Sequence, residues 1–127
     1  MFEIKVRDHL FIAHSLKDDF FGEAKNLHGA TYVIDLVISS EKLDEKNVVI
    51  DIGLASEVLK KCIAAYNYKN LDDIQKFKNL ITTTEFMSKV LVDDFIIELK
   101  KSRHPVVEKL LPLGKEFIAN DLSMNLK

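Results

Sequence analysis

The chain has 127 residues, 47% hydrophobic and 30% charged, so its length fits one domain with a core of its own. Eighteen Lys and Arg against twenty Asp and Glu give a net charge of −2, which excludes a general attraction to nucleic acid or to an anionic membrane. A single cysteine excludes an internal disulfide framework, and the first residues lack the apolar run of a signal peptide. We therefore expect a cytoplasmic chain with no transmembrane helix and no nucleic-acid or membrane partner.

Two long strands are predicted in the first third of the chain. Residues 2–14 and 28–39 each alternate between apolar and polar positions, which is typical of a strand with one buried face. The segment 17–27 between them contains Gly22 and is too short to hold a crossover helix. The two strands should therefore pair antiparallel.

Two helices are predicted after the strands. Residues 54–66 have apolar residues at helical spacing, and Asp51 stands where it can cap this helix. Thr82 and Glu85 match a T-x-x-E capping box that opens a second helix, which should end near Lys101. Its expected buried stripe comprises Phe86, Met87, Val90, Leu91 and Ile97. Residues 104–127 contain Pro105, Pro112 and Gly114 without alternation, which favours short helical pieces or disorder.

Histidines mark the facing ends of the two strands. His14 ends the first strand and His28 opens the second, so antiparallel pairing would bring the two imidazoles together. Catalytic zinc normally takes three protein ligands and an open position, so this pair is an incomplete zinc site. The alternative is two strand-end histidines that make ordinary hydrogen bonds.

Other candidate groups have a structural interpretation beside the chemical one. Cys62 lies on an apolar helix stripe, where a small buried side chain is the stronger interpretation than a nucleophile. The hydroxyl cluster Thr82 to Thr84 stands at a predicted helix start, where one hydroxyl can cap the helix and two could bind a polar heterocycle or an anion. The acid pairs are expected on solvated faces: Asp18 with Asp19, Asp72 with Asp73, and Asp93 with Asp94.

Four islands of sequence resemble the 6-pyruvoyl-tetrahydropterin synthase / 6-carboxy-tetrahydropterin synthase family of the queuosine pathway. They are FIAHSL at 11–16, FG at 21–22 followed by LHGATY at 27–32, VIDIG at 49–53, and TTTE at 82–85. The resemblance implies an α+β T-fold over residues 1–103, an antiparallel sheet with two helices packed on one face. Residues 104–127 would be a divergent C-terminal tail of the same domain, in which the family's last strand pair is not visible. Subunits of this family join their sheets into a barrel, which implies a homo-oligomer.

The resemblance also implies a degenerate zinc site. His14 matches the first metal ligand of the family and His28 the second, but Ala30 stands where the third histidine should be. Alanine has no ligand atom, so zinc binding should be weakened.

The family's catalytic groups are replaced as well. Ala24 matches the position of its catalytic thiolate, and Asn67 with Tyr68 match its Asp–His pair. Glu23 beside Ala24, or Tyr68, could serve as a substitute acid or base. Thr83 and Thr84 match the turn that holds the pterin ring, and Glu116 is the nearest candidate for the family's C-terminal pterin-binding glutamate.

Two functions follow from these departures. One is a divergent pterin-handling lyase, acting on dihydroneopterin triphosphate or a related pterin through altered catalytic residues. The other is a non-catalytic T-fold homologue that binds a pterin or purine or acts as an oligomeric scaffold.

Overall fold

Two long antiparallel strands form the centre of the computed structural model, which describes residues 1–101 and the backbone of 117–126. Strand β1 (Phe2–His14) pairs along its whole length with β2 (His28–Ser40), from Phe2 opposite Ser40 to His14 opposite His28. Both predicted strands and their antiparallel pairing are confirmed. The segment between them contains the 3₁₀ helix η1 (Asp19–Lys25), and Gly22 adopts φ 58° there, which suits a residue without Cβ.

Two shorter strands complete a mixed sheet of order β3-β1-β2-β4. Strand β3 (Lys69–Asn70) runs parallel to β1 at one edge, and β4 (Phe117–Leu126) runs antiparallel to β2 at the other. The short 3₁₀ helices η2 (Leu71–Asp73) and η3 (Gln75–Phe77) follow β3.

Strand β4 corrects the expectation of helical pieces or disorder for its part of the tail. A bulge lies opposite the stretch between Val33 and Asp35 of β2. Before the bulge, the odd-numbered residues Phe117 and Ala119 pair with apolar residues of β2. After the bulge, the even-numbered residues Met124 and Leu126 pair with apolar residues of β2, because the bulge adds one residue to β4. This change of phase hides the alternation in the sequence. The rest of the tail, including Glu116, lies outside the described residues.

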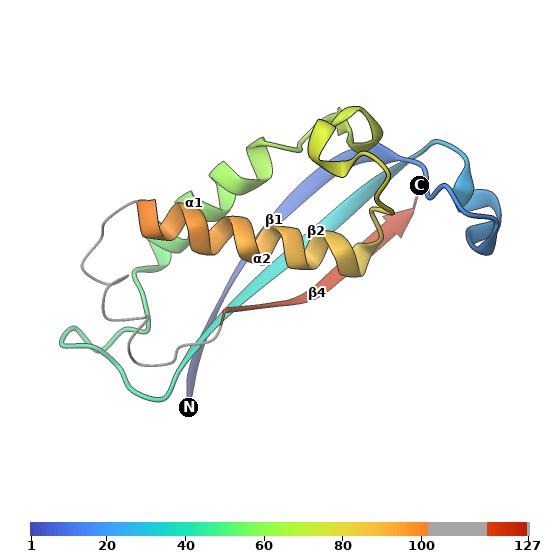
Figure 1. Cartoon of the computed structure of the whole chain (residues 1–127). Coiled ribbons are helices and arrows are strands. Elements are labelled where there is room, and N and C mark those ends of the chain that lie inside the picture. The colour runs from blue at the N-terminus through green and yellow to red at the C-terminus, as the bar shows by residue number, and fades with distance from the viewer. Residues whose placement is uncertain (102–116, 127) are drawn as a thin grey trace.

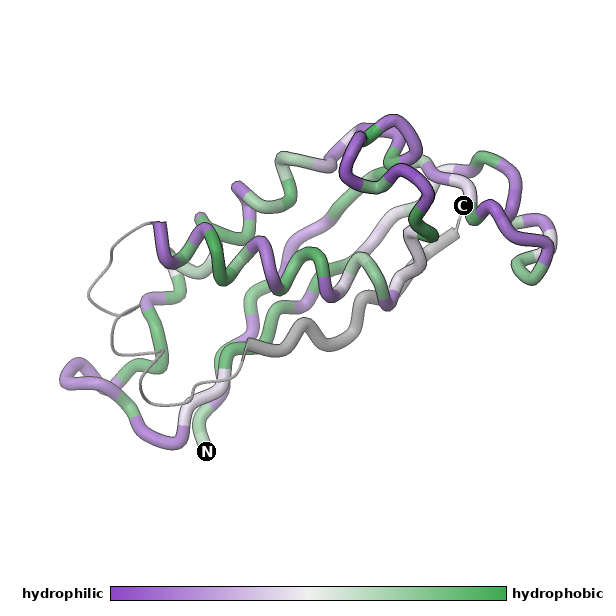
Figure 2. The backbone as a smooth tube through the Cα atoms, in the orientation of Figure 1, coloured by the Kyte–Doolittle hydropathy of each residue, from purple (hydrophilic) through white to green (hydrophobic). Residues whose placement is uncertain are grey.

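The helices α1 (Ile52–Ala64) and α2 (Thr84–Lys101) lie together on one face of the sheet, as Figure 1 shows. The core fills the space between them and the apolar face of β1 and β2. In Figure 2 apolar segments run through the helices and the strands, whereas the loop from β2 to α1 is mainly hydrophilic. The α+β class with two helices on one sheet face is confirmed, and no described helix has the length and apolar character needed to cross a membrane.

The caps and the buried stripe of the helices differ in part from the prediction. Asp51 caps α1, because its carboxylate accepts hydrogen bonds from the backbone N–H groups of Gly53 (2.8 Å) and Leu54 (3.4 Å). Thr83, not Thr82, caps α2 by accepting from the N–H of Phe86 at 3.1 Å. The fully buried residues of α2 recur every four positions, which leaves Ile97 exposed on the outer side; they are Met87, Leu91, Phe95 and Leu99.

Candidate functional site

The two strand-end histidines come together as the register predicts. His14 is fully buried, and its ring centroid lies 4.7 Å from that of His28 at an angle of 65°. The Nδ1 of His28 donates to the carbonyl oxygen of Asn26 at 2.7 Å. The Nε2 atoms of both rings are buried and have no hydrogen-bond partner among the described residues. The pair thus offers two buried imidazole nitrogens to a ligand.

Thr82 holds His14 from the start of α2. Its Oγ1 lies 3.0 Å from the Nδ1 of His14, and only 2% of Thr82 is exposed. Sequence reasoning assigned Thr82 to a helix cap and missed this contact, because the T-x-x-E motif fits position 82 equally well. The contact orients the His14 ring through its Nδ1 and leaves Nε2 without a partner among the described residues.

Burial lowers the pKa of His14 below its ordinary 6.5, and the neighbouring His28 lowers it further. The carboxylate of Asp72 acts in the opposite direction. Asp72 accepts hydrogen bonds from the backbone N–H of Ser15 (3.2 Å) and from the Ser15 hydroxyl, which joins η2 to the end of β1.

The paired acidic residues therefore do more than face solvent, because their carboxylates bind other residues of the chain. Asp72 binds Ser15, Asp94 binds Tyr66, and Asp93 pairs with Lys89 one helical turn away. Asp18 caps η1, and Asp19 pairs with Lys25. Two of these contacts join residues far apart in the chain, so no local pattern could have predicted them.

Ala30 lies two positions after His28 and is buried, with 5% exposed. It therefore lies on the same sheet face as the two imidazoles and brings no donor atom to them. The part of the chain that the structure describes contains no group of three His, Cys, Asp or Glu side chains able to hold a metal ion.

The hydroxyls at the start of α2 have three separate environments. Thr82 contacts His14 and Thr83 caps the helix, as described above. Thr84 lies beside the hydroxyl of Tyr32, whose pKa burial raises to about 12. The Tyr32 ring in turn packs edge-on against His14, with centroids 6.4 Å apart. Thr82 and Thr84 thus form a polar cluster with Tyr32 and the two histidines under the helix start, whereas Thr83 serves as the cap.

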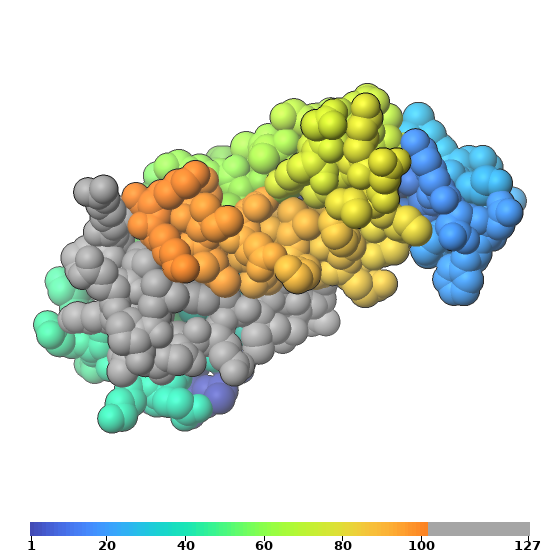
Figure 3. All heavy atoms as spheres, viewed as in Figure 1, coloured from blue at the N-terminus to red at the C-terminus, as the bar shows by residue number. Residues whose placement is uncertain are grey.

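Glu23 and Ala24 lie on η1, which projects from one end of the molecule (Figure 3). Glu23 is exposed, and Ala24 ties the segment to β1 by accepting a hydrogen bond from the N–H of Leu16 at 3.0 Å. A recess of about 600 Å³ opens along η1, and another of about 450 Å³ lies towards the loop before α2. Ser15 and Lys17 line both recesses, next to His14 in the sequence.

Asn67 and Tyr68 contact the opposite, outward side of β1. The side-chain oxygen of Asn67 accepts from the N–H of Phe11 at 3.0 Å, and the Tyr68 ring stacks on that of Phe11. Tyr68 has φ 60°, a left-handed conformation that costs a residue with a side chain about 1–2 kcal/mol. A stacked aromatic pair contributes about 0.5–1.5 kcal/mol, so stacking and strain roughly offset each other.

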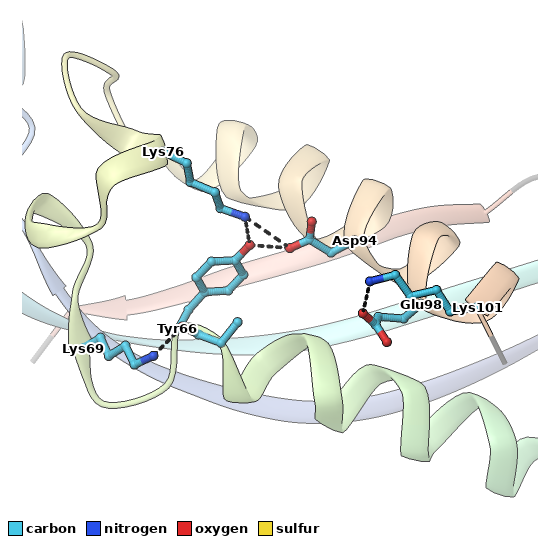
Figure 4. A network of polar contacts seen from close by, with 7 residues as sticks. Tyr66, Lys69, Lys76, Asp94, Glu98 and Lys101 are labelled. Atoms are coloured by element: carbon cyan, nitrogen blue, oxygen red, sulfur yellow. Dashed lines mark hydrogen bonds and ion pairs between the residues drawn. The ribbon is translucent and has the colours of Figure 1, made fainter.

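Cys62 is a core residue, as predicted. It is 3% exposed, and burial raises the pKa of its thiol to about 11, helped by Asp94 and Glu98. Nearby, the Tyr66 hydroxyl contacts both Asp94 and Lys76 (Figure 4). This network joins the segment after α1 to η3 and α2 and has a structural role.

Comparison with known proteins places this chain in a family. The family model described as 6-pyruvoyl tetrahydropterin synthase matches residues 3–110. The 6-pyruvoyl tetrahydropterin synthase of Caenorhabditis elegans superposes with a TM-score of 0.63 at 17% identity, over 99% of this chain and 95% of that one. The enzyme of Plasmodium vivax gives 0.67 at 14% identity, over 98% of both chains.

The fold and the match over most of the chain define a T-fold protein of the tetrahydropterin synthase type. The chain belongs to the 6-pyruvoyl tetrahydropterin synthase family. The resemblance inferred from the four sequence islands is confirmed.

Segments of curated proteins named DNA mismatch repair protein MutS are also similar. The protein of Bacteroides thetaiotaomicron is 26% identical over 102 residues, which is 72% of this chain and 12% of that protein. That of Halalkalibacterium halodurans is 43% identical over 54 residues, 42% of this chain and 6% of that protein. The chain therefore spans about a tenth or less of the length of these relatives.

Proposed function

We propose that this chain binds a pterin, or a purine-like ring with similar hydrogen-bonding edges, and has lost the standard lyase turnover of its family. The observation that carries the proposal is the buried polar site of His14, His28 and the threonines at the start of α2. Two imidazole nitrogens there lack partners among the described residues, and an unpaired buried polar atom is costly unless a ligand or water meets it. Family membership supports a pterin as that ligand.

The zinc that the resemblance implies does not fit the described residues. His14 and His28 could supply two ligands, but Ala30 supplies none, and a catalytic zinc site normally has three. A two-ligand site should hold the ion weakly. We therefore propose no reaction step through a metal.

The positions of the substitute catalytic residues also argue against the standard route. Tyr68 is 79% exposed and stacks on Phe11, on the other side of β1 from the buried ring of His14. Glu23 is exposed on η1 and does not share the buried site. Within a single chain neither is held beside the two histidines.

A second candidate, a lyase that uses Glu23 as its base, is favoured by one observation. A structure of the Plasmodium vivax enzyme is described as a variant in which a catalytic glutamate is replaced by alanine. Glu23 stands next to the position that matches the family's thiolate. The recess of about 600 Å³ along η1 leaves room for a substrate near this segment.

An assay with dihydroneopterin triphosphate separates the two candidates. Absence of turnover in Mg²⁺ or Zn²⁺ would exclude the lyase, whereas turnover that Glu23→Gln abolishes would establish it. Turnover that survives this change would point to Tyr68 or to the C-terminal tail. Fluorescence titration with neopterin measures binding directly, and Thr84→Ala should weaken it while Ser88→Ala, one turn further along α2, should not.

We propose neither mismatch repair nor any other activity of the MutS proteins for this chain. The segment that resembles this chain makes up 12% of the Bacteroides thetaiotaomicron protein. The family model instead covers residues 3–110 of this chain.

A further inference from the structure

The ring pair of Phe11 and Tyr68 forms a flat aromatic surface at the β3 edge of the sheet. Their ring centroids lie 5.4 Å apart and the planes differ by 11°, so the rings are nearly parallel. Tyr68 is 79% exposed and Phe11 36%. The side of the Tyr68 ring that does not meet Phe11 is therefore accessible to a ligand.

Two hydrogen bonds to the backbone of Phe11 and Tyr68 fix the position of this pair. The N–H of Tyr68 donates to the carbonyl of Phe11 at 2.6 Å, and the N–H of Phe11 donates to the side-chain oxygen of Asn67 at 3.0 Å. The parallel pairing of β3 with β1 begins directly after Tyr68. These contacts hold Tyr68 at φ 60°, a left-handed backbone conformation that is unfavourable for a residue with a bulky side chain.

The stability of the fold does not account for this arrangement. The favourable stacking and the unfavourable conformation of Tyr68 roughly offset each other, and most of its ring area remains in solvent. Strained residues that the surrounding structure holds in place occur preferentially at ligand and active sites. The exposed ring surface is the feature that this arrangement produces.

A shallow recess of about 270 Å³ adjoins the aromatic pair. Ala13, Lys69 and Asn70 form part of its wall. The Lys69 amino group donates to the Ala65 carbonyl at 3.0 Å, and the side-chain oxygen of Asn70 accepts from the N–H of Asp72 at 3.0 Å, so both polar side chains are fixed beside the recess. Cavities for drug-sized ligands measure about 300–1,000 Å³, so this recess suits a small fused ring better than an extended ligand. An aromatic surface with polar groups at its edge is the usual composition of a site for a planar heterocycle.

We infer that the exposed face of Tyr68, backed by Phe11, is a stacking site for a planar heteroaromatic ring of the pterin or purine class. The inference goes beyond the proposed function, from which it takes only the class of ring: it places ring recognition on the side of β1 opposite to His14, at Tyr68, which the resemblance associates with acid–base chemistry. In this role Tyr68 contributes its π face, and its hydroxyl is dispensable. Ring stacking then predicts that tyrosine and phenylalanine are equivalent at position 68 and that leucine is not.

The test is a fluorescence titration of the full chain with neopterin and, separately, with guanosine. Tyr68→Leu keeps apolar area but removes the ring, and it should weaken binding about 5- to 150-fold, as loss of one base–aromatic stack does. Tyr68→Phe should bind within about twofold of the natural chain. Phe20→Leu, which removes another exposed ring on η1, is the matched control and should bind normally. Circular dichroism checks that all variants fold.

The outcomes separate this inference from the proposed function. Neopterin binding that Tyr68→Leu leaves unchanged would overturn the stacking site but not pterin binding by the chain. Guanosine binding that depends on Tyr68, without any neopterin binding, would support the stacking site and the purine-like ligand, and it would refute a pterin as the ligand. Failure of the natural chain to bind either ring would overturn both.

Discussion

Replacing Thr82 by valine tests whether this residue holds His14 inside the site. The change swaps a hydroxyl for a methyl group at a position that is 2% exposed, so the volume of the side chain is nearly kept. It removes the group 3.0 Å from the Nδ1 of His14, which is itself fully buried. Leaving a buried polar atom without its partner costs about 1–3 kcal/mol of unfolding free energy.

For a domain of this size that loss should lower the urea midpoint by about 1 M, because the free energy changes by about 1–3 kcal/mol per molar urea. The assay is urea unfolding followed by circular dichroism, at one protein concentration for all variants. Ser88→Ala is the control, since the Ser88 hydroxyl donates to the Thr84 carbonyl within α2. A Thr82→Val midpoint equal to that of Ser88→Ala would refute the role assigned to Thr82.

Three further outcomes are expected. Burial lowers the pKa of His14, so below about pH 6.5 the unfolded chain takes up a proton at this residue that the folded chain does not. The urea midpoint should therefore fall between pH 7.5 and pH 5.5. In His14→Asn it should fall less steeply. Equal slopes in both proteins would contradict this assignment. Metal analysis should find less than one zinc per natural chain, and Ala30→His should bind zinc tightly; no gain would show that positions 14, 28 and 30 do not converge. Sedimentation at micromolar concentration should show a homo-oligomer that pairs exposed strand edges, and a clean monomer would count against this assembly.

Periodic segments could be predicted from the sequence, because their burial pattern is local. The alternation of β1 and β2 gave their limits to within one residue, and the encounter of His14 with His28 followed from antiparallel pairing. Asp51 capped the first helix as its spacing indicated. These features depend on neighbours in the chain or on one simple pairing rule.

Features that depend on distant partners could not be predicted. Strand β4 was missed because its bulge shifts the alternation by one residue. Thr82 was assigned to the cap because its true partner, His14, lies 68 positions away. The contact of Asp72 with Ser15 spans 57 positions and arises only once β3 lies beside β1.

The central claim is that the chain binds a pterin-class ring and does not convert it to the product of the family's lyase reaction. Equilibrium dialysis against dihydroneopterin triphosphate, with Mg²⁺ or Zn²⁺ present and mass spectrometry of both compartments, tests this claim most directly. We predict that the unchanged compound is enriched on the protein side and that no pyruvoyl- or carboxy-tetrahydropterin forms. Product in either compartment, or equal substrate concentrations on the two sides, would contradict it.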